Sequence, residues 1–270
     1  LQSVWKERSV SPALILCRCK SIVQMKRVVR VKALSDTPYL ISEEAADVIG
    51  KGSYGKVVRA YNRTDASKLY AVKVFELNSL KEHRSGLQEL SIVGKLPRNP
   101  NLVHYEKIKL TSKNCMYLVM EECNGGTLSQ LLARSESLTD SEICQFVSDF
   151  VNGYRCLYEC GIVHRDIKTD NVLLHDGRYK IADFGLSKIM QERSKTTSIR
   201  GSPVFLAPEL FHKGTSGSKL DVYSFGVTLY YACYKRYPYT SRLRYVSMEE
   251  LLADINRSEL MLPTGRSDWL

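Results

Sequence analysis

The most informative run in this sequence is His164-Arg165-Asp166-Ile167-Lys168-Thr169-Asp170-Asn171, and Asp183-Phe184-Gly185 begins twelve residues after its end. Between these motifs, residues 172–174 and 179–182 have the composition of short strands, and Asp176-Gly177 between them is a turn signal. We therefore expect a hairpin here. Such a hairpin brings Asn171 next to Asp183, and two oxygen donors of this kind suit a hard cation such as Mg²⁺.

The side chains around the predicted hairpin are those that phosphoryl transfer requires. Asp166 can orient an attacking hydroxyl group, Lys168 brings a cation near the transferred group, and a metal ion neutralises phosphate charge. The two motifs resemble the H-R-D-x-x-x-x-N catalytic loop and the D-F-G motif of eukaryotic-type protein kinases. The resemblance implies ATP and Mg²⁺ as cofactors, and Asp166 and Lys168 as catalytic residues. It makes Asn171 and Asp183 the metal ligands.

A glycine-rich run upstream is similar to a second motif of the same family. The run from Gly50 to Val57 has the pattern G-x-G-x-x-G-x-V, in which glycines let the backbone fold over a phosphate chain without a Cβ in the way. Alone it is weak support, because glycine pairs are common in turns. Strands are predicted at residues 57–61 and 69–75, and Ala71-Val72-Lys73 resembles the kinase strand whose lysine contacts the α- and β-phosphates. The ATP-binding residues implied here are Ile49, Gly50, Lys51, Gly52, Ser53, Tyr54, Gly55, Lys56, Val57, Ala71 and Lys73.

A lysine that grips phosphates needs a carboxylate to hold it in place. A helix is predicted from about Ser85 to Leu96, because apolar residues recur there at nearly helical spacing. Glu89 lies in this helix, and the resemblance implies that it pairs with Lys73 as part of the ATP site. Glu82 and Glu76 are alternatives, although both lie close to the end of the preceding strand.

The connection between the two lobes of the expected fold is also recognisable. An apolar strand is predicted at residues 116–120, and it runs into Glu121-Glu122-Cys123-Asn124-Gly125-Gly126. By resemblance, Met120 lies at the back of the adenine pocket, and the carbonyl of Glu121 and the amide of Cys123 bind the adenine edge. Leu173 is assigned to the same ATP site.

The segment downstream of the D-F-G motif carries regulatory and structural signals. Residues 201–209 resemble the end of a kinase activation segment, and the resemblance implies that Asp221 anchors the catalytic-loop backbone by hydrogen bonds. Lys168 is typical of the serine/threonine class. Thr197 and Ser198 are candidate phosphorylation sites for an upstream activating kinase. The alternative is that this Ser/Thr-rich stretch is only a polar loop.

The resemblance implies an α+β, two-lobed, protein-kinase-like fold. A small β-rich N-lobe with one helix is expected at residues 41–122, after a basic N-terminal extension at residues 1–40. A larger, mainly helical C-lobe is expected at residues 123–270. This C-lobe is expected to lack its final helices, because no Arg follows Glu209 at the distance usual for the family.

Composition agrees with a soluble enzyme. The chain has 270 residues and 44% hydrophobic content, which is enough to bury a sizeable core, and it has no apolar run of the length of a membrane span. Its eight cysteines have no regular pairing pattern, which predicts a reducing, cytoplasmic location, with the nucleus as the alternative.

The positive charge is concentrated at the N-terminus. Residues 1–34 hold eight basic residues and one acidic residue. The favoured interpretation is a tail without a defined role, because short basic tails are common. The alternative is an arm that binds an acidic partner, anionic lipid or nucleic acid, and no specific nucleic-acid binding is predicted. The basic residues are Lys6, Arg8, Arg18, Lys20, Lys26, Arg27, Arg30 and Lys32.

The sequence therefore predicts an ATP-dependent serine/threonine protein kinase that acts on protein substrates. A pseudokinase or scaffold that keeps the fold without turnover is the main alternative. A small-molecule phosphotransferase is a third, and the peptide-docking character implied for residues 201–209 argues against it.

Overall fold

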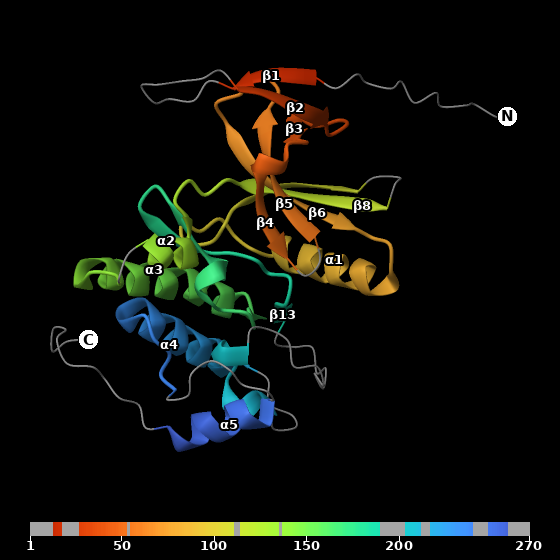
Figure 1. Ribbon diagram of the computed structural model, residues 1–270. Coiled ribbons are helices and arrows are strands. Elements are labelled where there is room, and N and C mark those ends of the chain that lie inside the picture. Colours follow the sequence, from red (N-terminus) through yellow and green to blue (C-terminus); the bar gives the residue numbers. More distant parts are fainter. Residues whose placement is uncertain are drawn as a thin grey trace. The chain divides into compact units, whose positions relative to one another are not determined.

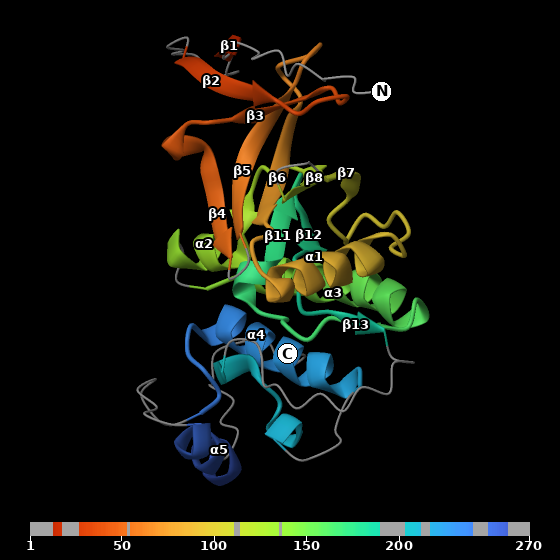
Figure 2. The same ribbon diagram turned by 90° about the vertical axis from the view of Figure 1, so that its right-hand side faces the viewer.

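The computed structural model describes residues 13–17, 27–52, 55–110, 114–134, 137–189, 203–211, 217–239 and 248–258 (Figures 1 and 2). These residues belong to two compact units. The first takes the chain as far as Glu82 together with Tyr105–Glu122, and the second takes His83–His104 and the chain from Cys123 onward. The mixture of an antiparallel sheet in one unit and mainly helices in the other confirms the predicted α+β fold class.

Eight of the described strands form one antiparallel sheet in the first unit, in the order β1-β2-β3-β5-β6-β8-β7, with β4 also paired to β5. The predicted strands at 57–61, 69–75 and 116–120 are confirmed and lie within β5, β6 and β8. The strands are β1 (Ala13–Cys17), β2 (Arg27–Ala33), β3 (Tyr39–Ser42), β4 (Val48–Gly52), β5 (Gly55–Asn62), β6 (Leu69–Glu76), β7 (Tyr105–Leu110) and β8 (Cys115–Glu121), and the 3₁₀ turn η1 (Ala45–Asp47) lies between β3 and β4.

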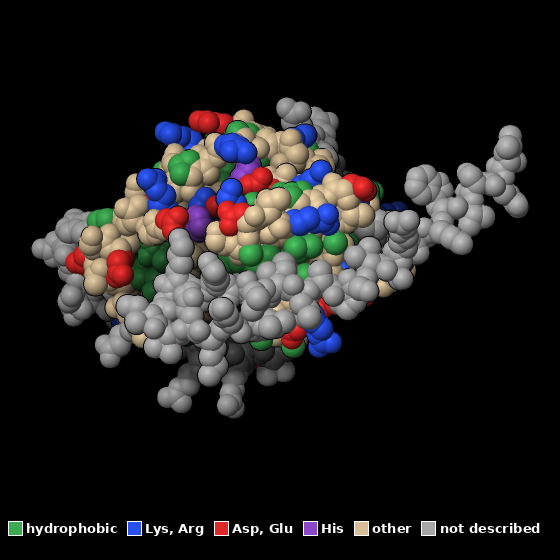
Figure 3. All heavy atoms as spheres, turned by 90° about the horizontal axis from the view of Figure 1, so that it is seen from above, with side chains coloured by type: hydrophobic (Ala, Val, Ile, Leu, Met, Phe, Trp, Pro, Cys, Tyr) green, Lys and Arg blue, Asp and Glu red, His purple; other side chains and the backbone are tan. Residues whose placement is uncertain are grey.

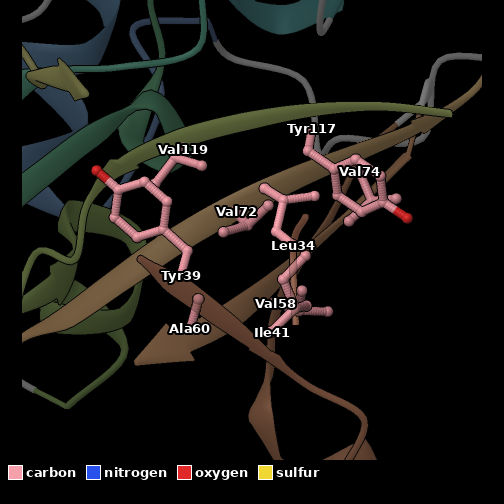
Figure 4. Packing of buried hydrophobic residues seen from close by; sticks show 9 residues of the cluster. All are labelled: Leu34, Tyr39, Ile41, Val58, Ala60, Val72, Val74, Tyr117 and Val119. Atoms are coloured by element: carbon pink, nitrogen blue, oxygen red, sulfur yellow. The ribbon is translucent and has the colours of Figure 1, made fainter. Parts of the chain in front are cut away.

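The two faces of this sheet are packed differently. On one face, alternate residues of the central strands form a buried cluster that includes Val58, Val72 and Val119 (Figure 4). On the opposite face, Tyr61 packs with Leu40 and with two valines of β2, Val29 and Val31. Strand β2 lies in the region expected to be a basic extension, and it is an integral part of the sheet.

The second unit is built around two antiparallel helices. Helix α3 (Asp140–Glu159) begins at a capping box in which Thr139 and Glu142 satisfy each other's backbone amides. Phe150 of α3 stacks on Phe225 of α4 (Lys219–Tyr234), with ring centroids 3.8 Å apart. The remaining helical elements here are α2 (Leu128–Arg134), α5 (Met248–Arg257), η2 (Thr169–Asn171), η3 (Pro203–Phe205) and η4 (Pro208–Phe211).

Helix α1 (Leu80–Val93) differs from its predicted range. It begins about five residues earlier than expected and ends before Leu96, because Gly94 follows the last helical residue and tighter turns replace the helical hydrogen bonds. Leu87, one of the apolar residues within the predicted helix, is 59% exposed. The spacing located a helix but not its buried face.

The surface of the described residues carries charges of both signs. On the face shown in Figure 3, Lys and Arg side chains are interspersed with Asp and Glu side chains. Within the described ranges, no helix combines the length and the apolar character that a membrane crossing requires.

Candidate active site

The hairpin predicted between the two central motifs is confirmed. Strand β11 (Val172–His175) pairs with β12 (Arg178–Ile181), and β11 also pairs with β9 (Gly126–Thr127). Asp176 and Gly177 both have positive φ angles, of 48° and 74°, as a two-residue type I′ hairpin turn requires. At the open end, the amide of Ala182 donates to the carbonyl of Asn171 at 2.9 Å. This bond places Asn171 against the residue that precedes Asp183.

Asp166 is held by two other members of its own loop. Lys168 Nζ donates to Asp166 Oδ2 at 2.8 Å, and Asn171 Nδ2 donates both to Asp166 Oδ2 and to the Asp166 carbonyl oxygen, each at 2.8 Å. All three side chains are mostly buried. Both side-chain bonds end at Oδ2, so Oδ1 is left to accept a hydrogen bond from a bound hydroxyl group.

The orientation of Asn171 has a consequence for metal binding. Its amide nitrogen faces two acceptors of Asp166, so the amide oxygen is the atom that remains for a cation. Among the described residues there is no group of three or more His, Cys, Asp and Glu side chains able to hold a metal. One amide oxygen and the nearby carboxylate of Asp183 fit Mg²⁺, which keeps waters and substrate phosphates as its other ligands.

Asp221 anchors the backbone of the loop, as predicted. Its carboxylate is fully buried and accepts from the amides of His164 and Arg165, each at 2.7 Å. The hydroxyl of Tyr154 donates to the same carboxylate at 3.0 Å. Burial raises the pKa of Asp221, and the electrostatic interaction with His164 and these hydrogen bonds oppose the rise.

The side chain of His164 contacts both the catalytic loop and the D-F-G segment. Its Nδ1 accepts from the amide of Asp166 at 3.3 Å, so the proton resides on Nε2, which lies 3.0 Å from the carbonyl oxygen of Ala182. The ring also meets the fully buried ring of Phe184 edge to face at 5.3 Å. The catalytic-loop motif and the D-F-G motif therefore share one buried support.

Two additional contacts of this support were not predicted from the sequence. Ser187 Oγ donates to the carbonyl of His164 at 3.2 Å, and Gln88 Nε2 of α1 donates to the carbonyl of Ser187 at 2.6 Å. Ser187 leads directly into β13 (Lys188–Ile189), which pairs with β10 (Ile162–Val163) just before the loop. A sequence separation of 99 residues between Gln88 and Ser187 leaves no local signal for such a contact.

The ATP-binding residues predicted in the first unit lie on β4, β5, β6 and β8. The register pairs Val57 with Lys73 and Ala71 with Met120, so these four side chains share one face of the sheet. A Cβ on Gly55 would lie 2.1 Å from the carbonyl oxygen of Val74, which only glycine avoids. Ile49, Gly50, Lys51, Gly52 and Lys56 lie on the adjoining β4–β5 hairpin, whereas Ser53 and Tyr54 lie outside the described residues.

The remaining predicted residues are divided between the two units. Lys73 is buried on β6 in the first unit, and Glu89 is buried on α1 within the second, so their pairing stays a prediction. Glu121 ends β8, Cys123 opens the second unit, and Leu173 is a half-buried residue of β11. Thr197 and Ser198 lie outside the described residues.

Comparisons with known proteins agree with this geometry. A model of the protein kinase domain family matches residues 44–266. The chain is 33% identical over 218 residues to serine/threonine-protein kinase dst1 of Dictyostelium discoideum, covering 76% of this chain and 29% of that protein. It is 33% identical over 189 residues to calcium/calmodulin-dependent protein kinase type 1 of Caenorhabditis briggsae, covering 68% and 52%.

A third relative belongs to the same class. The chain is 36% identical over 202 residues to serine/threonine-protein kinase Sgk1 of Danio rerio, covering 72% of this chain and 46% of that protein. The chain thus spans between 29% and 52% of the length of these relatives.

Proposed function

The chain belongs to the eukaryotic-type serine/threonine protein kinase superfamily, and we propose that it is a catalytically active member that uses ATP and Mg²⁺. The proposed reaction transfers the γ-phosphoryl group of ATP to serine or threonine hydroxyl groups of protein substrates. The observation that supports it best is the hydrogen-bonded set of Asp166, Lys168 and Asn171, in which Lys168 Nζ and Asn171 Nδ2 each lie 2.8 Å from Asp166 Oδ2. Phosphoryl transfer depends almost entirely on such positioning and charge stabilisation.

The hydrogen bonds within this set suggest a role for each of its residues. Asp166 Oδ2 is occupied by Lys168 and Asn171, so Oδ1 accepts the substrate hydroxyl and takes its proton late in the reaction. The hydroxyl oxygen bonds to the γ-phosphorus as the bond from that phosphorus to the β,γ-bridging oxygen breaks, and ADP leaves. Lys168 lies close enough to Asp166 to face the transferred group with positive charge.

Two sets of residues bind the phosphates in this proposal. Asn171 and Asp183 would bind Mg²⁺, which supplies neutralisation of phosphate charge when bound. Lys73, with Glu89 as its partner, would fix the α- and β-phosphates, and the glycine-rich run from Gly50 to Gly55 would lie close to them. Adenine would lie against the face of the sheet that carries Val57 and Ala71.

The chain carries the residues whose loss is typical of pseudokinases, which favours turnover over scaffolding. Lys73, Asp166 and Asp183 are all present, and Asp166 has its expected neighbours. A cytoplasmic location, phosphorylation by an upstream kinase at Thr197 or Ser198, and an acidic partner for the basic N-terminal residues are further parts of the proposal.

Transfer of labelled phosphate from ATP to a generic basic protein tests the proposal. Wild type should label the protein, Asp183→Ala should abolish labelling, and Asp166→Asn should lower kcat by several orders of magnitude while nearly keeping nucleotide affinity. Asp176→Asn is the matched control, because this exposed carboxylate lies at the hairpin turn, and its left-handed backbone suits asparagine. Wild-type chain that binds MgADP but transfers no phosphate would establish the pseudokinase alternative instead.

A further inference from the structure

Arg59 of β5 holds the last residue of the first unit. Its Nε lies 3.0 and 2.9 Å from the two carboxylate oxygens of Glu122, and its Nη2 lies 2.6 Å from Oε1. Such a two-pronged contact fixes both the position and the rotation of a carboxylate. Glu122 directly follows the final residue of β8 and directly precedes Cys123.

A buried carboxylate fixes Arg59 from the other side. Asp47 is fully buried, and its Oδ1 accepts from Arg59 Nη1 at 3.3 Å. Its Oδ2 accepts from the hydroxyl of Ser42 at 2.7 Å and from that of Tyr61 at 3.3 Å. The guanidinium group therefore lies between two carboxylates, and its hydrogen bond to Glu122 is the main reason that the pKa of Arg59 is raised. It stays charged at every accessible pH.

This support extends to the N-terminal strand. Tyr61, which donates to Asp47, packs against Val29 and Val31 of β2. Strand β2 precedes the family match, which begins at residue 44. A contiguous series of packed and hydrogen-bonded side chains thus runs from an added strand, through Tyr61, Asp47 and Arg59, to Glu122.

The series ends where nucleotide recognition is expected. Register places Arg59 opposite Ala71, which in turn pairs with Met120, so Arg59 shares the sheet face assigned to adenine. Glu122 lies between Glu121 and Cys123, whose backbone carbonyl and amide are the groups assigned to the adenine edge. The side chain of Glu122 is only 12% exposed, so its carboxylate has little freedom once Arg59 grips it.

We propose that Arg59 is a positioning residue for nucleotide binding. By clamping Glu122, it holds the backbone of residues 121–123 in the conformation that presents hydrogen-bonding groups to adenine, with Asp47 and strand β2 as its brace. This proposal rests on the proposed function, because it assigns the ion pair between Arg59 and Glu122 to the ATP site. It predicts a defect in nucleotide affinity rather than in the chemical step, and a purely structural ion pair would produce no such selectivity.

The test measures MgADP affinity by calorimetry, and kcat and the KM for ATP by phosphate transfer, on the full chain. Arg59→Ala and Glu122→Ala should each weaken MgADP binding and raise the KM by about tenfold, with kcat within about twofold of wild type. The double variant should be no worse than either single variant, because both remove the same contact. Lys109→Ala is the matched control, since it breaks the ion pair between β7 of the same sheet and the exposed side chain of Asp36, and it should leave affinity unchanged.

Several outcomes of these measurements would overturn the proposal. Wild-type affinity in a folded Glu122→Ala variant would overturn it, as would a fall in kcat without a change in affinity. If the alanine variants do not fold, Glu122→Gln keeps the side-chain size and removes the charge, and unchanged MgADP affinity in that variant would also overturn it. A wild-type chain that binds no MgADP would instead refute the proposed function, and the clamp proposal with it.

Discussion

Replacing Asp221 by alanine tests how the catalytic loop is held in place. The substitution removes the acceptor for the amides of His164 and Arg165, both at 2.7 Å, of which the His164 bond is buried and the Arg165 bond is partly buried. The hydroxyl of Tyr154 loses one acceptor but keeps the carbonyl of Ser218 at 3.1 Å. One buried amide and one partly buried amide therefore lose this acceptor.

The size of the effect follows from these orphaned groups. A buried amide that loses its partner costs about 1–3 kcal/mol, and the partly buried amide of Arg165 costs less, so the alanine variant should lose roughly 2–4 kcal/mol of folding stability. That is a large part of the 5–15 kcal/mol typical of a domain. Asp221→Asn should lose less, because the amide oxygen can still accept from one donor and because burial already disfavours the charged carboxylate, as its raised pKa indicates.

Activity should fall for a separate reason. Arg165 has a φ angle of 69°, a conformation that non-glycine residues rarely adopt, and its amide is one of the two that Asp221 holds. Once released, this backbone can relax and displace Asp166, the next residue. A displacement near 1 Å lowers the rate by about 10²-fold, so we expect kcat to fall by that factor in Asp221→Asn while MgADP affinity stays near wild type.

Urea unfolding and steady-state kinetics measure the two effects, with Tyr154→Phe as the matched control. Tyr154→Phe removes one donor to the carboxylate and leaves both loop amides satisfied, so it should cost about 1 kcal/mol and little kcat. Asp221→Asn with wild-type kcat and an unchanged urea midpoint would show that the loop keeps its conformation without this anchor.

Three further predictions concern the second unit. Ser187→Ala removes the 3.2 Å bond to the His164 carbonyl, and should cost about 1 kcal/mol and lower kcat without raising the KM for ATP; an altered KM alone would contradict this role. Burial raises the pKa of Tyr179 to about 12 from 10.0, so the unfolded chain releases this proton first, and stability falls as the pH rises from 10 through 12. Tyr179→Phe cannot release this proton, so urea unfolding should show that the variant loses less folding stability between pH 10 and 12 than the wild type, by on the order of 2–3 kcal/mol. The same dependence of stability on pH in both proteins would exclude the effect. Gly153→Ala improves helix propensity by about 1 kcal/mol, yet its Cβ would lie 2.6 Å from the Asn101 carbonyl oxygen, so a thermal melt should show net destabilisation; a raised melting temperature would show that the contact yields easily.

The parts of the molecule that the sequence predicted are those encoded by neighbouring residues. The hairpin between Asn171 and Asp183 was predictable, because strand composition, turn residues and both motifs lie within one short stretch. The anchoring by Asp221 followed from resemblance alone, since nothing local connects it to a loop 56 residues away. The range of α1 was predicted poorly, because apolar spacing does not say where capping and a following glycine end a helix.

The ion pair between Arg59 and Glu122 could not be predicted from the sequence, for a physical reason. Arg59 and Glu122 are 63 residues apart, and each is a residue type that is usually solvated. Only the strand register, which pairs Arg59 with Ala71 and Ala71 with Met120, brings them to the same face of the sheet. The strand pattern at 57–61 predicted which residues alternate but not which partner strand each would face.

Backbone strain gives an argument for the location of the site that does not depend on motif matching. Arg165 and Asp183 have φ angles of 69° and 62°, although neither is a glycine or lies in a hairpin turn. Strain of this kind costs roughly 1–3 kcal/mol per residue and persists only where surrounding contacts impose it. Here the contacts are present, because Asp221 holds the Arg165 amide, and Asp183 Oδ1 accepts from the Gly185 amide at 3.3 Å while the intervening Phe184 is fully buried. Arg165 directly precedes Asp166, and Asp183 directly follows Ala182, whose amide donates to the carbonyl of Asn171. A fold that served only as a scaffold would gain nothing from maintaining strain at these two positions, so their conformations favour the catalytic proposal.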